Sequence, residues 1–144
     1  MRMESGFLHW GHDISPEENQ YQAGLNFAIS FKKNVDFIGK KAVEKIKTQK
    51  LDKRFAMFTL KNNEPGYPLL LHEEPIYLDN KIIGKTTSGN YSFNFNKNLT
   101  FGYIKNDFSN KELINKELFV EVEKQKHPIS IQLQALKQTN FKNQ

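Results

Sequence analysis

The stretch EPIYLDNKIIGKTT, residues 74–87, decides the fold class of this 144-residue chain. Residues 74–78 and 81–87 are short runs rich in apolar and β-branched side chains, which favour strands. Asp79-Asn80 lies between them and is a common turn pair. The stretch therefore predicts an antiparallel β-hairpin.

Short strand patterns continue on both sides of this hairpin. They cover residues 54–61, 90–95, 99–104, 118–123 and 129–136, with polar turns between them. The pair Ser88-Gly89 predicts a turn that reverses the chain after the strand carrying Lys85. Six or seven short strands without an intervening helix predict a small antiparallel barrel or sandwich.

The first fifty residues have a different pattern. Apolar residues alternate by two over residues 23–31, which predicts a strand, and residues 39–49 show the spacing of an amphipathic helix. A short helix or turn is expected after Ser15. The fold class is therefore α+β, with one unit over residues 1–50, a β-barrel over residues 51–137 and a polar tail over residues 138–144.

Composition excludes several classes of protein. Hydrophobic residues make up 38% and charged residues 26% of the chain, as in globular proteins, and there is no cysteine for a disulfide or a thiol nucleophile. No apolar run is long enough to span a membrane, and the first residues do not form a signal peptide, so a cytoplasmic protein is expected.

The net charge of +5 raises the question of nucleic-acid binding. Residues 1–50 hold eight basic against six acidic residues, and the remainder holds thirteen against ten. With this division the positive charge is spread along the chain, and only two of the basic residues are arginine. We therefore expect neither a nucleic-acid partner nor a membrane partner.

The stretch RMESGFLHWGHDI, residues 2–14, has the side chains of a binding pocket. The Glu4 carboxylate can accept paired N–H donors from a planar heterocycle while the Trp10 ring covers its face. The alternative is a buried aromatic residue flanked by a solvated acid. His9, His12 and Asp13 could together hold a metal, but Gly11 makes the required helix doubtful, and we expect no metal site.

Five motifs in order make the chain resemble the folate-binding aminomethyltransferase family, which includes the glycine cleavage T-protein and the C-terminal parts of dimethylglycine and sarcosine dehydrogenases. The HWGHD and EPIY variants look closer to the dehydrogenase branch. The motifs are RMESG with HWGHDI, YQAGL, DFIGKKA, EPIY and TTSGNYS, and they begin at residues 2, 9, 21, 36, 74 and 86.

The resemblance implies tetrahydrofolate as cofactor and a Greek-key fold for the barrel. It implies that Glu4 pairs with the pterin, with Arg2 and Trp10 beside it. Thr87, Ser88 and Tyr91, from the TTSGNYS motif, are expected to line the same site. The alternative is a purely structural turn. The family's catalytic aspartate comes from a segment outside this sequence, so the catalytic residue is unknown.

One family contact is replaced in this chain. Where the T-protein has an arginine for the glutamate end of folate, this sequence has Glu64 and Pro65. An acid cannot replace a guanidinium that binds a carboxylate. Lys85, Arg54 or another lysine is therefore expected to hold the folate tail, unless folate binds weakly.

Three hypotheses follow. The chain is the C-terminal portion of a tetrahydrofolate-dependent aminomethyltransferase-like protein, incomplete as a catalyst alone. Alternatively, it is a non-catalytic subunit that docks on a separate N-terminal half or forms a homodimer, with an exposed apolar face around Phe7, Leu8, Phe27 and Phe31. A third alternative is a barrel that binds another small molecule.

Overall fold

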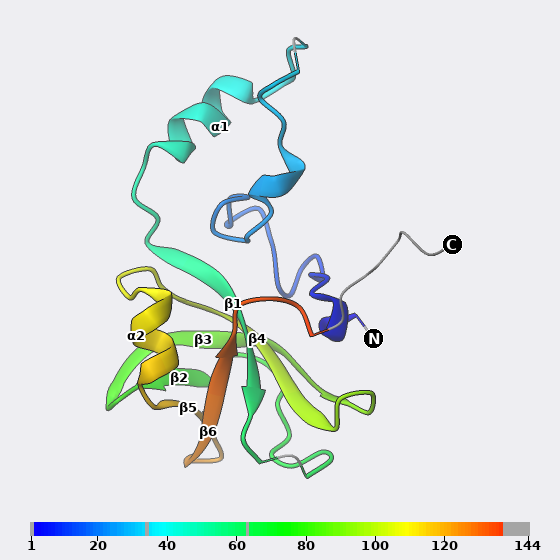
Figure 1. Cartoon of the computed structure of the whole chain (residues 1–144), viewed down its shortest axis with the longest axis vertical. Helices are drawn as coiled ribbons and strands as arrows, with labels where there is room; N and C mark the ends of the chain where they lie inside the picture. Colours follow the sequence, from blue (N-terminus) through cyan, green and yellow to red (C-terminus); the bar gives the residue numbers. More distant parts are fainter. Residues whose placement is uncertain (1, 34, 63, 137–144) are drawn as a thin grey trace.

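The computed structural model describes residues 2–33, 35–62 and 64–136, and its main element is a closed barrel of six antiparallel strands (Figure 1). The fold is therefore mostly β. The strands are β1 (Lys53–Leu60), β2 (Pro75–Leu78), β3 (Lys81–Ser92), β4 (Lys97–Lys105), β5 (Leu118–Val122) and β6 (Gln125–Gln132).

The order of strands around the barrel is β1-β4-β3-β2-β5-β6, and β6 pairs back with β1. Strands β2, β3 and β4 follow one another as hairpins, and β1 lies beside β4 although a long connection joins it to β2. This is the order of a Greek key. The hairpin predicted over residues 74–87 is confirmed, with Tyr77 opposite Ile82 and Leu78 opposite Lys81.

Strand β3 corrects one prediction. Residues 81–87 and 90–95 were expected to form two strands separated by a turn at Ser88-Gly89. Instead, β3 continues through Ser88 and Gly89 and ends at Ser92. A register shift between Thr86 and Ser88 marks a bulge, which bends a strand without ending it. Gly89 serves a close approach, because a Cβ atom there would lie 2.2 Å from the Cβ of Leu70.

A second helix, α2 (Asn110–Asn115), interrupts the run of strands, contrary to prediction. The hydroxyl of Ser109 accepts from the backbone N–H of Glu112, and the Glu112 carboxylate accepts from the backbone N–H of Ser109. This capping box begins the helix. Leu113, which is fully buried, attaches the helix to the barrel.

Apolar side chains that alternate along the strands fill the barrel. Phe58 and Val120 are completely buried, as is Ile76, whose strand β2 lies between β3 and β5. A second, smaller cluster lies at one end of the barrel, where Met3 packs with Phe101 and Leu99 of β4. The N-terminal segment is therefore anchored on the barrel through its first residues.

The first fifty residues contain little regular structure. They hold two 3₁₀ turns, η1 (Met3–Ser5) and η2 (Asn26–Ala28), and one helix, α1 (Lys40–Lys47), close to the predicted helix over residues 39–49. The strand predicted over residues 23–31 is wrong. No sheet edge lies alongside this segment among the described residues, and a strand needs a partner for its backbone groups.

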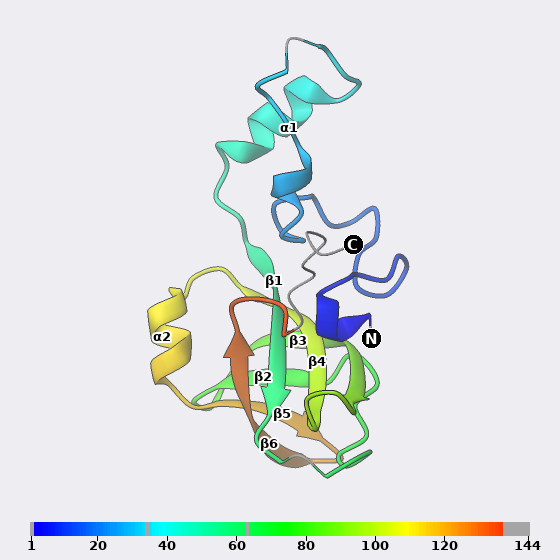
Figure 2. The ribbon, with the colours of Figure 1, turned by 45° about the vertical axis from the view of Figure 1, so that its right-hand side comes forward.

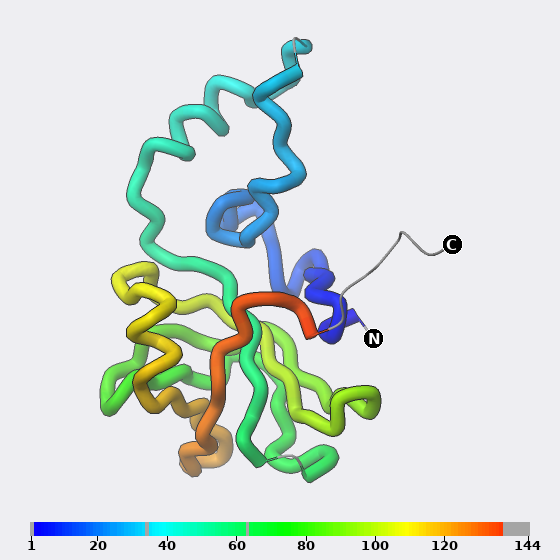
Figure 3. The backbone as a smooth tube through the Cα atoms, in the orientation of Figure 1, coloured from blue at the N-terminus to red at the C-terminus, as the bar shows by residue number. Residues whose placement is uncertain are grey.

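Residues 25–50, called the arm below, leave the barrel, turn back at their far end and return into β1 (Figure 3). Both ribbon views show α1 standing away from the barrel (Figure 2). No described residue of the arm is buried. The arm therefore projects from the barrel.

The predicted tail, residues 138–144, lies outside the described residues. No helix in the described part of the chain is long and apolar enough to cross a membrane.

Candidate functional site

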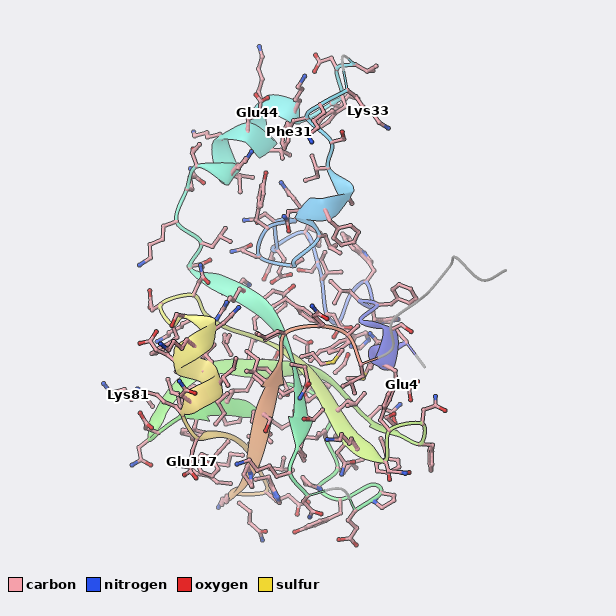
Figure 4. All side chains as sticks on the ribbon, in the orientation of Figure 1. Glu4, Phe31, Lys33, Glu44, Lys81 and Glu117 are labelled. Atoms are coloured by element: carbon pink, nitrogen blue, oxygen red, sulfur yellow. The ribbon has the colours of Figure 1, made fainter. Side chains whose placement is uncertain are left out.

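The turn η1 holds Glu4 against the end of the hairpin formed by β3 and β4 (Figure 4). The turn ends at Gly6, which has a φ of 74°, a left-handed conformation that favours glycine. Glu4 is only 3% exposed. Its carboxylate accepts hydrogen bonds from the Ser92 hydroxyl at 2.5 Å and from the Asn94 side-chain amide at 2.9 Å.

These two hydrogen bonds set the charge of Glu4. The hydrogen bond from Ser92 has the largest effect and lowers the pKa of Glu4. The hydrogen bond from Asn94 lowers it further, and burial opposes both. The carboxylate is therefore ionised near neutral pH and is an acceptor only.

Glu4 lines a first cavity of about 320 Å³ between the N-terminal segment, β3 and the chain before β2. Arg2 and Tyr91, both predicted site residues, line it as well. The other lining residues are Met3, His12, Leu70, Leu71, His72, Thr87, Ser88, Gly89, Asn90, Ser92 and Leu99. The structure thus brings five of the predicted site residues, Arg2, Glu4, Thr87, Ser88 and Tyr91, to one cavity.

Arg2 is fixed at the rim of this cavity. One guanidinium nitrogen lies 2.6 Å from the Asp13 carboxylate and 2.8 Å from the Phe7 carbonyl oxygen, and the other donates to the Ser88 hydroxyl at 3.2 Å. The guanidinium also stands 5.6 Å from the centre of the Phe101 ring. These contacts orient Arg2 from both its own segment and the barrel.

Asp13 is a residue that sequence reasoning considered only as a metal ligand. Its buried carboxylate accepts from Arg2, from the backbone N–H of His9 at 2.9 Å and from the Thr87 hydroxyl at 2.6 Å. Burial alone would raise the pKa of Asp13. The hydrogen bonds to its carboxylate, first of all that from Thr87, outweigh burial, so the pKa is lowered. No group of three potential metal ligands was found among the described residues.

A second cavity of about 710 Å³ shares His12 and Thr87 with the first. Lys85 lines this second cavity and makes a 2.6 Å ion pair with Glu73. The cavity's other cations are Lys53 and Lys105. Lys53 lies 2.6 Å from Glu18.

Two residues considered in the sequence lie elsewhere. Arg54 donates to the Asn110 side chain at 2.7 Å and to the Phe108 carbonyl oxygen at 2.9 Å, so it is committed to the start of α2. Trp10 is 66% exposed and lines neither cavity. Its role as a cover for a heterocycle stays a prediction.

The site residues that sequence analysis missed are Ser92 and Asn94. They lie 88 and 90 residues after Glu4 in the chain. Ser92 is the last residue of the TTSGNYS motif, but the motif does not indicate that its hydroxyl contacts Glu4. Only the closure of the barrel brings the segments together.

Comparison with known proteins identifies the class. Residues 53–136 match the family described as the glycine cleavage T-protein C-terminal barrel domain. The chain is 31% identical over 131 residues to mitochondrial dimethylglycine dehydrogenase of Mus musculus, and 32% identical over 107 residues to aminomethyltransferase of Symbiobacterium thermophilum. The chain belongs to this T-protein barrel family.

The same fold occurs in the crystal structure of glycine cleavage system aminomethyltransferase T from Bartonella henselae, with a TM-score of 0.78 and 21% identity. That match covers 94% of this chain and 37% of the other. The sequence matches cover 91% of this chain but 14% of the mouse protein, and 72% of this chain but 27% of the Symbiobacterium protein. The chain thus corresponds to a C-terminal portion of its relatives.

Proposed function

We propose that this chain is the C-terminal portion of a tetrahydrofolate-dependent aminomethyltransferase-like protein, and that its first cavity binds the pterin ring. The buried, ionised Glu4 carboxylate at that cavity supports the proposal. Paired N–H donors on a planar ring suit such a carboxylate. A volume near 320 Å³ suits a ring head group, being at the lower end of small-molecule sites.

Two other residues of the first cavity support the proposal. Arg2 lines the cavity and is held by Asp13 and Ser88. Tyr91 also lines it, and the centre of its ring lies 5.0 Å from that of Phe93 in an edge-on contact. Tyr91 is the aromatic residue that the geometry favours for contact with the pterin face, with Trp10 retained as a further candidate.

The folate tail is proposed to continue into the second cavity. The two cavities share His12 and Thr87 as lining residues, so they are neighbours. Lys85, Lys53 and Lys105 line the second cavity, and an ammonium group can hold a carboxylate as a point charge. Lys85, the residue expected from the sequence, would exchange its ion pair with Glu73 for the folate carboxylate. Arg54 lines neither cavity and donates to Asn110 and Phe108 at the start of α2.

Tetrahydrofolate, when bound, would supply the nitrogen that accepts a one-carbon unit. The residues of this chain would bind and orient the cofactor, and the group that acts on the one-carbon donor would come from outside the chain, as the family resemblance implies. We therefore expect weak folate binding and no turnover by the 144-residue chain alone, because part of the pocket is missing.

A titration tests this proposal. Isothermal calorimetry with tetrahydrofolate is expected to give a binding signal for the unchanged chain and one about tenfold weaker or more for Glu4→Gln, since a hydrogen bond to a charged group contributes roughly 1.5–3 kcal/mol. Glu117→Gln, at an exposed position that lines neither cavity, is the matched control. Equal heat from Glu4→Gln and the unchanged chain would refute the pterin assignment.

A second candidate function is a non-catalytic subunit that docks on a separate N-terminal half. The coverage figures favour it, because most of each relative lies outside the matched region. Size-exclusion chromatography over a range of concentrations, with and without the complementary portion, separates this function from homodimer formation.

A further inference from the structure

The arm, residues 25–50, differs in charge from the segment before it. It contains seven lysines against two acidic residues, a net charge of +5 that equals the net charge of the whole chain. Residues 1–24 contain one arginine against four acidic residues. Counting residues 1–50 together hides this difference, because the acidic first segment offsets the basic arm. The prediction that the positive charge is spread along the chain is therefore wrong.

The arm also exposes large apolar side chains. Ile38 is fully exposed, Phe27 is 81% exposed, and Val35 is exposed as well. On α1, Val43 and Ile46 are one helical turn apart and share a face, and neither is buried. Apolar side chains gathered among lysines on a projecting segment are typical of an interaction surface.

The arm's own contacts are few. The rings of Phe31 and Phe37 lie 6.4 Å apart, and the Lys47 ammonium stands 5.4 Å from the Phe31 ring centre. Among the described residues, Lys50 is the only arm lysine within ion-pair distance of a carboxylate, at 3.1 Å from Asp107. An eight-residue helix is not stable alone in water. The arm therefore needs a covering surface.

The charge and the coverage of the relatives indicate what covers it. The fold match to the Bartonella henselae protein includes 94% of this chain, while 63% of that protein lies outside the match. A second copy of this chain would bring another arm with the same charge, which is unfavourable. The arm has no arginine, the residue that nucleic-acid sites favour, and it exposes Ile38 and Phe27.

We propose that the arm docks on the N-terminal portion of the family protein, through an apolar patch on that portion surrounded by aspartate and glutamate side chains. Phe27, Ile38 and the Val43 face of α1 would enter the patch. The lysines around them, including Lys33 and Lys45, would face the carboxylates. Figure 4 shows Lys33 and Phe31 with Glu44 at the end of the arm farthest from the barrel.

This inference rests on the second candidate function and not on folate binding. Glu4 lies at η1, beside the barrel and outside the arm. Glu4→Gln is therefore expected to weaken tetrahydrofolate binding while leaving docking unchanged. Failure of one proposal can thus be told from failure of the other.

The test uses the full 144-residue chain. The probe is the polypeptide from the same organism that matches the N-terminal portion of the aminomethyltransferase relatives, purified as a separate chain. Calorimetry at low and high salt is expected to show binding that weakens with salt, because exposed charge pairs are screened. The triple change Lys33→Glu, Lys41→Glu and Lys45→Glu, and separately Ile38→Asp, should each weaken binding about tenfold or more.

Matched controls lie on the barrel. Lys61→Glu, Lys97→Glu and Lys111→Glu together change the net charge equally at exposed positions, and Ile114→Asp places an acid at another exposed isoleucine. These controls should bind within about twofold of the unchanged chain. All the variants should melt at nearly the same temperature, since none of the changed residues is buried.

Several outcomes would overturn the proposal. They are absence of binding to the N-terminal portion, absence of such a polypeptide from the organism, an equal loss in the barrel controls, and arm-dependent binding to a 20-base-pair DNA or RNA duplex in place of the polypeptide. Arm-dependent self-association that excludes the N-terminal portion would assign the arm to a homodimer and also overturn it.

Discussion

The Ser92 hydroxyl donates a hydrogen bond to the Glu4 carboxylate at 2.5 Å, which joins the first turn of the chain to the last residue of β3. The same carboxylate would accept donors from a bound ring. One residue therefore serves both the attachment of the N-terminal segment and the proposed site.

Replacing Ser92 with alanine tests this dual role. The change removes one hydrogen-bond donor to the buried Glu4 carboxylate, and the expected loss of unfolding free energy is about 1–3 kcal/mol. Urea unfolding at neutral pH measures it. Ser30→Ala, at an exposed arm position, is the control and should change the free energy by less than about 0.5 kcal/mol. An unchanged midpoint for Ser92→Ala would contradict a structural role for the bond.

Replacing Asp13 with asparagine should destabilise the chain in a pH-dependent way. The buried Asp13 carboxylate pairs with a partly exposed Arg2, and the expected loss at neutral pH is about 2–3 kcal/mol. The folded-state pKa of Asp13 is lowered. Its contribution to stability is thus complete above the ordinary value of about 3.9 and is lost as the pH falls through the lower folded-state value.

The measurement is urea unfolding of both proteins from pH 7 down to pH 3. The difference between them should be constant above about pH 5 and should narrow below about pH 4. Asp107→Asn is the control, because its pair with Lys50 is exposed and contributes less than about 1 kcal/mol. A difference that widens on acidification would show that the assigned direction of the pKa shift is wrong.

The cap of α2 gives a third prediction. Ser109→Ala removes the side-chain acceptor of the capping box and should lower the unfolding free energy by about 1 kcal/mol. Leu113→Ala, which removes the helix's buried anchor, should cost about 2–5 kcal/mol. Thermal unfolding of the two variants ranks them. Equal effects would mean that the cap contributes as much to stability as Leu113, which contradicts the role of Leu113 as the main anchor.

The barrel was predictable where local pattern and tertiary structure agree. The hairpin over residues 74–87 follows from two strand runs and a turn pair, and it is confirmed in register. Where one strand bends at a bulge, as at Ser88-Gly89, turn-forming residues gave the wrong prediction because a bulge and a turn use the same residue types. Helix α2 has a capping signature in the sequence, Ser109 with Glu112, but the helix is only six residues long and lacks a clear helical apolar pattern.

Outside the barrel the sequence was less informative. Alternation over residues 23–31 is a strand pattern, but it identifies no partner, and the segment forms the turn η2 instead. In the site, the RMESG motif indicated Glu4 and Arg2, both of which line the first cavity. The contacts of Glu4 with Ser92 and Asn94 were not predictable, since they depend on which strand ends meet when the barrel closes.

Gly89→Ala connects the fold to the proposed site. A Cβ at this position would lie 2.2 Å from the Leu70 Cβ and 2.6 Å from the Leu70 carbonyl oxygen, so backbone must move. Such overpacking costs about 1–3 kcal/mol. Leu70 and Leu71 also line the first cavity, and their displacement should weaken tetrahydrofolate binding as well. Lys81→Ala, at an exposed position of β3 that lines neither cavity, should affect stability by less than about 0.5 kcal/mol. Thermal unfolding and calorimetric titration of both variants provide the check. If Gly89→Ala loses stability while binding tetrahydrofolate normally, the cofactor does not occupy the cavity beside Leu70.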